Sequence, residues 1–190
     1  VVFNVELPRS DEEVIPGVPW GAIEAFQTPA YWAYQVYARR RKGDRINYKL
    51  GATLKEEIGA CLLGGHGIPS NVGLAAFHHI KERGAFGDQP PSEETLFEWL
   101  KEPIAVDGRL VRYRFAKQKS RYLSAALRKL SVEIPPLGTG RALREWLLDI
   151  PGIGYKTASW IARNWLDADD VAILDIHILR AGLLGKFFES

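Results

Sequence analysis

The sequence predicts a mainly α-helical protein, built as one domain or as two lobes that share a cleft. Apolar residues recur at the 3.6-residue period of an α-helix through most of the chain. Only residues 1–7 and 104–115 favour β structure, the second with Asp107-Gly108 as the tight turn of a minor hairpin. Hydrophobic residues make up 46% of the 190 residues and charged residues 25%, a balance typical of a globular protein with a core.

The helices of the first two thirds are indicated by buried stripes and by one clear start signal. Two stripes have residues at i, i+3, i+4 and i+7: Gly73, Ala76, Phe77 and Ile80, and then Leu123, Ala126, Leu127 and Leu130. Ser92, which two glutamates follow, predicts the N-cap of a helix that continues through Leu100. Residues 64–73 contain four glycines, and we expect a loop that either links two helices or brings its backbone close to a ligand.

Two helices joined by a compact turn are predicted in the most informative stretch, residues 141–182. The apolar residues that define them are Leu143, Trp146, Leu147 and Ile150, and Ala158, Ile161, Ala162 and Trp165. The turn between them, residues 151–154, reads Pro-Gly-Ile-Gly. Such a turn presents backbone N–H groups at the start of the next helix, where the helix dipole also favours an anion. We expect Gly152, Ile153 and Gly154 to bind a phosphate; a plain link between packed helices is the alternative.

Two charged residues that follow this turn are candidates for a chemical role, although an isolated aspartate at a helix start more often only caps the helix. Lys156 is in the first turn of the second helix, where the positive dipole end disfavours an ammonium and favours the neutral amine that forms Schiff bases. Asp175 follows 19 residues later, ahead of residues 176–183 with helical spacing. It is predicted to be an N-cap, and backbone N–H groups would stabilise its ionised form.

Composition excludes several kinds of site. Cys61 is the only cysteine, so an internal disulfide, a cysteine-ligated zinc site and a four-cysteine iron-sulfur cluster are excluded. His177 has no partners at metal-ligand spacing, and we expect neither a metal nor an organic cofactor. No apolar stretch approaches the roughly 20 residues that cross a bilayer, and the first eleven residues lack the features of a signal peptide. We therefore expect an intracellular protein, in the cytoplasm or nucleoid and without a membrane partner.

Two segments resemble the helix-hairpin-helix, Gly/Pro-rich loop, aspartate superfamily of DNA glycosylases. They read LLDIPGIGYKTASWIARN and VAILDIHILRAG, and residues 117–130 (KQKSRYLSAALRKL) resemble the helix that precedes them in these enzymes. The resemblance implies a helical barrel lobe, residues 46–168, with the hairpin at 151–154. Residues 1–45 and 169–190 would form a second lobe across the active-site cleft. It also implies a monomeric base-excision repair enzyme that acts on double-stranded DNA containing a damaged base.

The same resemblance implies the catalytic roles. Members with a lysine after the hairpin cut the DNA backbone as well as the glycosidic bond, so Lys156 is expected to be the nucleophile of a glycosylase/AP lyase and Asp175 its catalytic carboxylate. The absent cysteine cluster and the Lys-to-Asp spacing resemble the compact prokaryotic 8-oxoguanine glycosylases. A glycosylase/lyase for another lesion, such as an oxidised pyrimidine, would have the same pair. A non-catalytic helix-hairpin-helix module that only grips DNA is the alternative from a different class.

Further residues are candidates for DNA contacts. By the resemblance, Lys119 and Arg121 would contact phosphates from the helix before the hairpin. Trp160 is one turn beyond Lys156 and forms either a wall of the base pocket or part of the core. His66 and Asn71 are in the loop where these enzymes insert a wedge into the duplex, and either could fill the space of an extruded base. Other basic residues, at 39–42, 117, 128 and 129, face either DNA or solvent.

Overall fold

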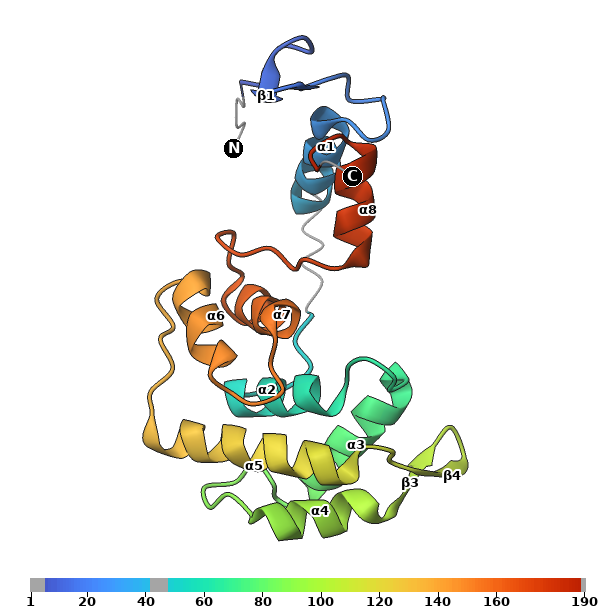
Figure 1. The fold of residues 1–190 in the computed structure, drawn as a ribbon, viewed down its shortest axis with the longest axis vertical. Helices are drawn as coiled ribbons and strands as arrows, with labels where there is room; N and C mark the ends of the chain where they lie inside the picture. The colour runs from blue at the N-terminus through green and yellow to red at the C-terminus, as the bar shows by residue number, and fades with distance from the viewer. Residues whose placement is uncertain (1–5, 42–47, 189–190) are drawn as a thin grey trace. The chain divides into compact units, whose positions relative to one another are not determined.

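The structure, a computed structural model, describes residues 6–41 and 48–188. These residues form eight α-helices and two small antiparallel sheets (Figure 1). The elements are β1 (Glu13–Ile15), β2 (Val18–Pro19), α1 (Pro29–Arg41), α2 (Leu54–Leu63), α3 (Ser70–Glu82), α4 (Glu93–Lys101), β3 (Pro103–Val106), β4 (Arg109–Arg112), α5 (Ala116–Val132), α6 (Gly140–Leu148), α7 (Tyr155–Leu166) and α8 (Ile176–Leu184). The predicted mainly α fold class is confirmed. None of the helices so described is long and apolar enough to span a membrane.

The described residues group into two compact units. Unit 2 comprises residues 48–173, and unit 1 comprises the described residues before 48 and after 173. The sequence-based division ended the helical lobe at residue 168, whereas residues 169–173 group with unit 2. The reason is that Asp170 accepts the backbone N–H groups of Gly140 and Arg141, at 3.1 and 3.0 Å, and so fastens this segment to the start of α6.

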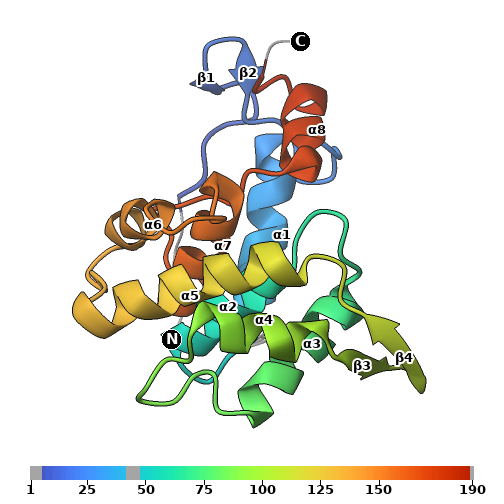
Figure 2. The same ribbon diagram turned by 60° about the horizontal axis from the view of Figure 1, so that its bottom comes forward.

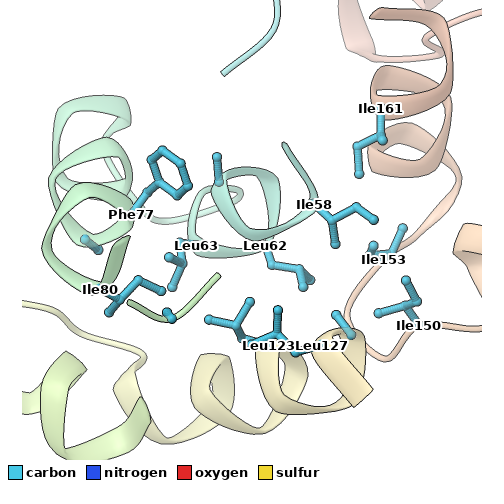
Figure 3. Close-up of a cluster of buried hydrophobic side chains, with 14 of the residues drawn as sticks. Ile58, Leu62, Leu63, Phe77, Ile80, Leu123, Leu127, Ile150, Ile153 and Ile161 are labelled. Atoms are coloured by element: carbon cyan, nitrogen blue, oxygen red, sulfur yellow. The ribbon is translucent and has the colours of Figure 1, made fainter. Parts of the chain in front are cut away.

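The core of unit 2 is formed where α2, α3, α5 and the α6–α7 pair meet. Figure 3 shows side chains from these elements pointing toward one another: Ile58, Leu62, Leu63, Phe77, Ile80, Leu123, Leu127, Ile150, Ile153 and Ile161. Each is almost completely buried, and burying one such side chain stabilises the fold by about 1.5–3 kcal/mol. The stripes predicted in α3 and α5 belong to this core, with Leu130 at its margin.

The predicted helix start at Ser92 is confirmed. Its hydroxyl oxygen accepts the backbone N–H of Thr95 at 3.1 Å, which satisfies one of the free N–H groups at the start of α4. Thr53 and Thr139 cap α2 and α6 in the same way.

The minor hairpin predicted within residues 104–115 is also confirmed. Strands β3 and β4 pair with Val106 opposite Arg109, and Asp107 and Gly108 both have positive φ, 49° and 76°, as a two-residue type I′ turn requires. Of the strand expected at residues 1–7, Glu6 and Leu7 belong to no strand, and residues 1–5 lie outside the described part. Instead, β1 and β2 pair further along the chain, around a turn in which Gly17 has a φ of 79°.

Helix α5 connects the two ends of unit 2. Figures 1 and 2 show the β3–β4 hairpin at the end where α5 begins and α6 at the end where it finishes. The long helix therefore joins the hairpin to the α6–α7 pair.

Candidate active site

The turn between α6 and α7 is built as the sequence predicts. Ile150 and Ile153 are buried and anchor it, and the Ile153 N–H donates to the Ile150 carbonyl at 3.1 Å. Gly152 has a φ of 86°, and a Cβ built there would be 2.2 Å from the ring of Tyr122. Only glycine therefore allows this backbone to pack on α5, which fixes the turn in place.

The first turn of α7 follows this turn directly. Its N-cap, Gly154, has no side chain to satisfy the first N–H groups of the helix, and Gly154 is itself exposed. These N–H groups and the positive dipole end favour an anion. Lys156 is the second residue of α7 and is exposed, so it does lie in the first turn.

Lys156 lines a cavity of about 490 Å³ within unit 2, called here the Lys156 cavity. Its volume lies within the range of small-molecule pockets, roughly 300–1,000 Å³. The wall comes from three helices and two loops, through Leu50, Ala60, Cys61, Gly64, Gly65, Ile68, Ser70, Gly73, Leu74, Lys156, Thr157 and Trp160. Trp160, half-buried, is thus on the wall, one helical turn from the lysine.

The glycine loop, residues 64–69, forms one side of this cavity and is held by two side chains from beyond β4. Tyr113 donates its hydroxyl hydrogen to the Leu63 carbonyl, and the Lys119 ammonium donates to the Gly64 carbonyl at 3.0 Å. Burial lowers the pKa of Lys119. Lys119, expected to contact phosphate, thus has a carbonyl partner in this structure, because its place on α5 directs it toward the end of α2.

His66 and Asn71, the two candidates for filling an extruded base's space, differ in their surroundings. His66 is exposed on the glycine loop between Gly65 and Gly67, whose φ values of 109° and 77° are left-handed. Asn71 is at the start of α3, and its amide is engaged at both ends. Its NH₂ donates to Asp107 at 2.7 Å, and its oxygen accepts the Val72 N–H at 3.0 Å.

A buried carboxylate in α2 holds part of the cavity wall. Glu57 is fully buried and accepts the backbone N–H groups of Leu50 at 2.6 Å and Gly51 at 2.9 Å. The Cys61 sulfur is 3.9 Å from its other oxygen, and burial, followed by the charge of Glu57, raises the pKa of this thiol. Sequence reasoning missed Leu50, Glu57 and Cys61. The available signal was a glutamate on the i, i+3, i+4, i+7 stripe that Leu54 begins.

Arg121 is beside the α6–α7 turn. Its guanidinium carbon is 5.5 Å from the ring centroid of Tyr122, the side chain that packs against Gly152. Arg121 is exposed, so its charge is available next to Gly152 and Gly154, the exposed glycines of the turn. Of the basic run 39–42, the side chains of residues 40 and 41 and all of Lys42 lie outside the described part of the chain.

Asp175 is the N-cap of α8, as predicted, and belongs to unit 1. One of its carboxylate oxygens accepts the backbone N–H groups of His177 and Ile178, at 2.9 and 3.1 Å. These bonds favour the ionised carboxylate.

Across residues 6–41 and 48–188, no group of three His, Cys, Asp or Glu side chains is arranged to hold a metal ion.

One family model and several curated proteins match this chain. A family model described as 8-oxoguanine DNA glycosylase, Ogg-HhH, matches residues 52–186. The 8-oxoguanine DNA glycosylase/AP lyase of Saccharolobus solfataricus is 40% identical over 85 residues, which are 40% of this chain and 41% of that protein. The protein of the same name from Methanocaldococcus jannaschii is 39% identical over 71 residues, 36% of this chain and 34% of that one. The aligned part therefore spans less than half the length of either relative.

One solved structure shares the fold. The crystal structure of the Methanocaldococcus jannaschii 8-oxoguanine DNA glycosylase matches with a TM-score of 0.51 and 24% sequence identity, over 85% of this chain and 71% of that one.

Proposed function

Since the chain belongs to the Ogg-HhH family of 8-oxoguanine DNA glycosylases, we propose that it removes 8-oxoguanine from double-stranded DNA and then cuts the strand. The observation that carries this proposal is the position of Lys156. It is on the wall of a cavity of about 490 Å³ and in the first turn of the helix that follows the Pro-Gly-Ile-Gly turn. A nucleophile beside a pocket and a phosphate-binding turn is what base excision requires.

The proposed reaction begins with extrusion of the damaged nucleotide, because C1′ of a stacked nucleotide is not accessible to an enzyme. The neutral amine of Lys156 attacks C1′, the C–N bond to the base breaks, and the base leaves with the bonding electrons and takes up a proton. Loss of a proton from nitrogen and opening of the sugar give a Schiff base. The Schiff base makes the hydrogen on C2′ more acidic. When a base removes this proton, the C3′–O bond breaks, the 3′ phosphate leaves, and the strand is cut.

Asp175 is proposed to act on the same sugar as Lys156. An ionised carboxylate stabilises the positive charge that develops on the sugar as the base departs, and it can accept or return protons. Its two N–H bonds at the start of α8 support this role, since they favour the charged form.

The remaining assignments concern the grip on DNA and the base pocket. We propose that Gly152 and Gly154 bind a backbone phosphate together with Arg121. Trp160 would stack on the extruded base, and His66 would occupy its vacated place. Ile153, Lys119 and Asn71 stay secondary candidates, because their polar groups have the partners described above. We further propose that the enzyme acts as a monomer in the cytoplasm or nucleoid, where it meets its DNA substrate.

Borohydride trapping tests the proposal. Wild type, Lys156→Gln and the control Lys101→Gln would each be mixed with duplexes that contain 8-oxoguanine, thymine glycol, an abasic site or no lesion. We expect a covalent adduct for wild type and the control, strongest with 8-oxoguanine, and none for Lys156→Gln, which still binds the duplex. An adduct strongest with thymine glycol would shift the substrate to oxidised pyrimidines. Absence of any adduct would exclude the lyase mechanism and leave a hydrolytic glycosylase or a DNA-binding module.

A further inference from the structure

We propose that the β4 arginine surface, defined as Arg112 and Arg114, is a second contact with the DNA backbone, beyond the α6–α7 turn. This inference rests on the proposed function, because it takes double-stranded DNA as the substrate. It adds a part of the chain, strand β4 and the turn into α5, that lies outside the α6–α7 turn and the Lys156 cavity.

The first argument is the distribution of charge. Between residues 108 and 132 the sequence has eight lysines and arginines and neither aspartate nor glutamate. The other 17 basic residues of the chain are outnumbered by its 23 acidic ones. A nearly neutral protein therefore concentrates its positive charge on β4 and α5, where like charges repel one another unless an anion neutralises them.

The second argument is that most of these charges have no acidic partner. Lys119 donates to the Gly64 carbonyl, and Lys129 pairs with Glu133 and Asp149. The other six are exposed and form no ion pair with any residue that the structure describes: Arg109, Arg112, Arg114, Lys117, Arg121 and Arg128.

The third argument is that the fold orients the arginines. Tyr113 is buried and its hydroxyl is bonded to the Leu63 carbonyl, so Arg112, the last residue of β4, points outward by the two-residue alternation of extended chain. Arg114 is exposed in the turn that leads into α5. The guanidinium carbon of Arg114 is 5.0 Å from the ring centroid of Phe115, a cation–π contact that reduces its freedom. A charge held in place loses less entropy when it binds a phosphate.

The fourth argument is continuity with the proposed active site. A Cβ built on Gly67 of the glycine loop would be 3.8 Å from the Phe115 ring, so Arg114 is next to the loop that lines the Lys156 cavity. In the other direction, Arg121 adjoins the α6–α7 turn through Tyr122. Residues 114 and 121 are seven positions apart, which corresponds to about 10 Å along a helix axis. This length equals about three base pairs along a DNA duplex. Figure 2 shows the β3–β4 hairpin extending beyond this stretch.

The experiment measures how salt weakens binding to a duplex that contains a stable abasic-site analogue. Affinity falls as salt rises, and each lost phosphate contact makes the plot of log affinity against log salt concentration less steep, by about 0.9 in slope. We expect this decrease for Arg112→Gln and for Arg114→Gln, with a loss of affinity at low salt. Arg112→Lys and Arg114→Lys, which keep the charge, should restore the wild-type slope. The control Arg128→Gln removes an equal charge from the far end of α5 and should leave the slope unchanged.

Slopes for Arg112→Gln and Arg114→Gln equal to that of wild type would overturn the inference. A decrease equal to that of Arg128→Gln would overturn it too, because net charge alone would then explain the effect. Borohydride trapping with the same proteins separates this failure from failure of the proposed function. If all variants form the Lys156 adduct while the slopes do not change, only the β4 contact is wrong. If wild type forms no adduct on any lesion, the proposed function is wrong.

Discussion

Asp175 combines two roles at the scale of a single residue, as helix cap and as proposed catalytic carboxylate, and substitution separates them. Asparagine caps a helix about as well as aspartate but has no charge. We expect Asp175→Asn to keep the thermal stability of wild type and to lose about 10²–10³-fold in single-turnover excision of 8-oxoguanine. Asp175→Ala should also lose about 1 kcal/mol of stability, as seen by urea unfolding. Full turnover by Asp175→Asn would limit this residue to capping.

Lys119 gives a prediction about pH. Burial lowers its pKa in the folded protein below the ordinary 10.5, so in the alkaline range up to that value the unfolded chain binds more protons than the folded one. The free energy of unfolding contributed by this group therefore rises with pH in that range. Cys61, Tyr113 and Lys129 have raised pKa values and act in the opposite direction, so the Lys119 contribution must be isolated as a difference. In urea unfolding at several alkaline pH values, the free energy of unfolding of wild type minus that of Lys119→Met should increase with pH. Lys117→Met, an exposed control on the same helix, should follow wild type; identical curves for all three would contradict the prediction.

Sequence reasoning succeeded for residues whose role depends on near neighbours. The first-turn position of Lys156 and the capping by Asp175 follow from a few adjacent residues. Lys119 could not be placed in this way, since its partner, Gly64, is 55 positions away in the sequence. The local pattern of basic residues predicts a phosphate contact, and only the folded chain shows the carbonyl beside the ammonium.

Among the elements, the α6–α7 turn depends most strictly on its sequence. We expect Gly152→Ala to destabilise the protein by more than about 1 kcal/mol, because its φ of 86° disfavours a side chain and the Tyr122 ring occupies the space. Gly154→Ala is the matched control. Its φ is −99° with nothing within 4 Å of a built Cβ, so a change within about 0.5 kcal/mol is expected. Chemical unfolding of both variants measures the difference, and equal losses would show that the turn is not constrained as described.

The elements also show where sequence patterns are sufficient. Apolar periodicity and caps predicted α3 to α8 correctly, and the Asp107-Gly108 pair predicted the β3–β4 hairpin. Strands β1 and β2 were missed because three and two residues are too short for an alternating pattern to be recognised. The cavity wall was predicted through Lys156, Trp160 and one of the two interpretations of residues 64–73, a loop close to a ligand. Leu50 and Cys61 could not be predicted, because they are held at the wall through Glu57, a contact between separate segments.

For the whole molecule, the proposed function requires both units to respond to one substrate. We expect hydrogen exchange with a lesion-containing duplex to slow at residues 153–157 in unit 2 and at residues 176–178 in unit 1. The undamaged duplex should protect only the first region, because it contains no damaged nucleotide that is extruded and on whose sugar Asp175 could act. Protection confined to unit 2 with the lesion duplex would argue against a role of Asp175 in the reaction. The grouping of residues 169–173 with unit 2 could not be derived from sequence, because it depends on the contact between Asp170 and the distant start of α6.

The wall of the Lys156 cavity also determines which chemical probes suit this protein. A compound that enters the cavity meets one thiol, Cys61, and one amine, Lys156. Burial raises the pKa of Cys61, so the thiolate that reacts with alkylating agents is scarce. Aldehydes that condense with amines, fixed by a mild reductant, are therefore better starting points for covalent inhibitors than maleimides or acrylamides.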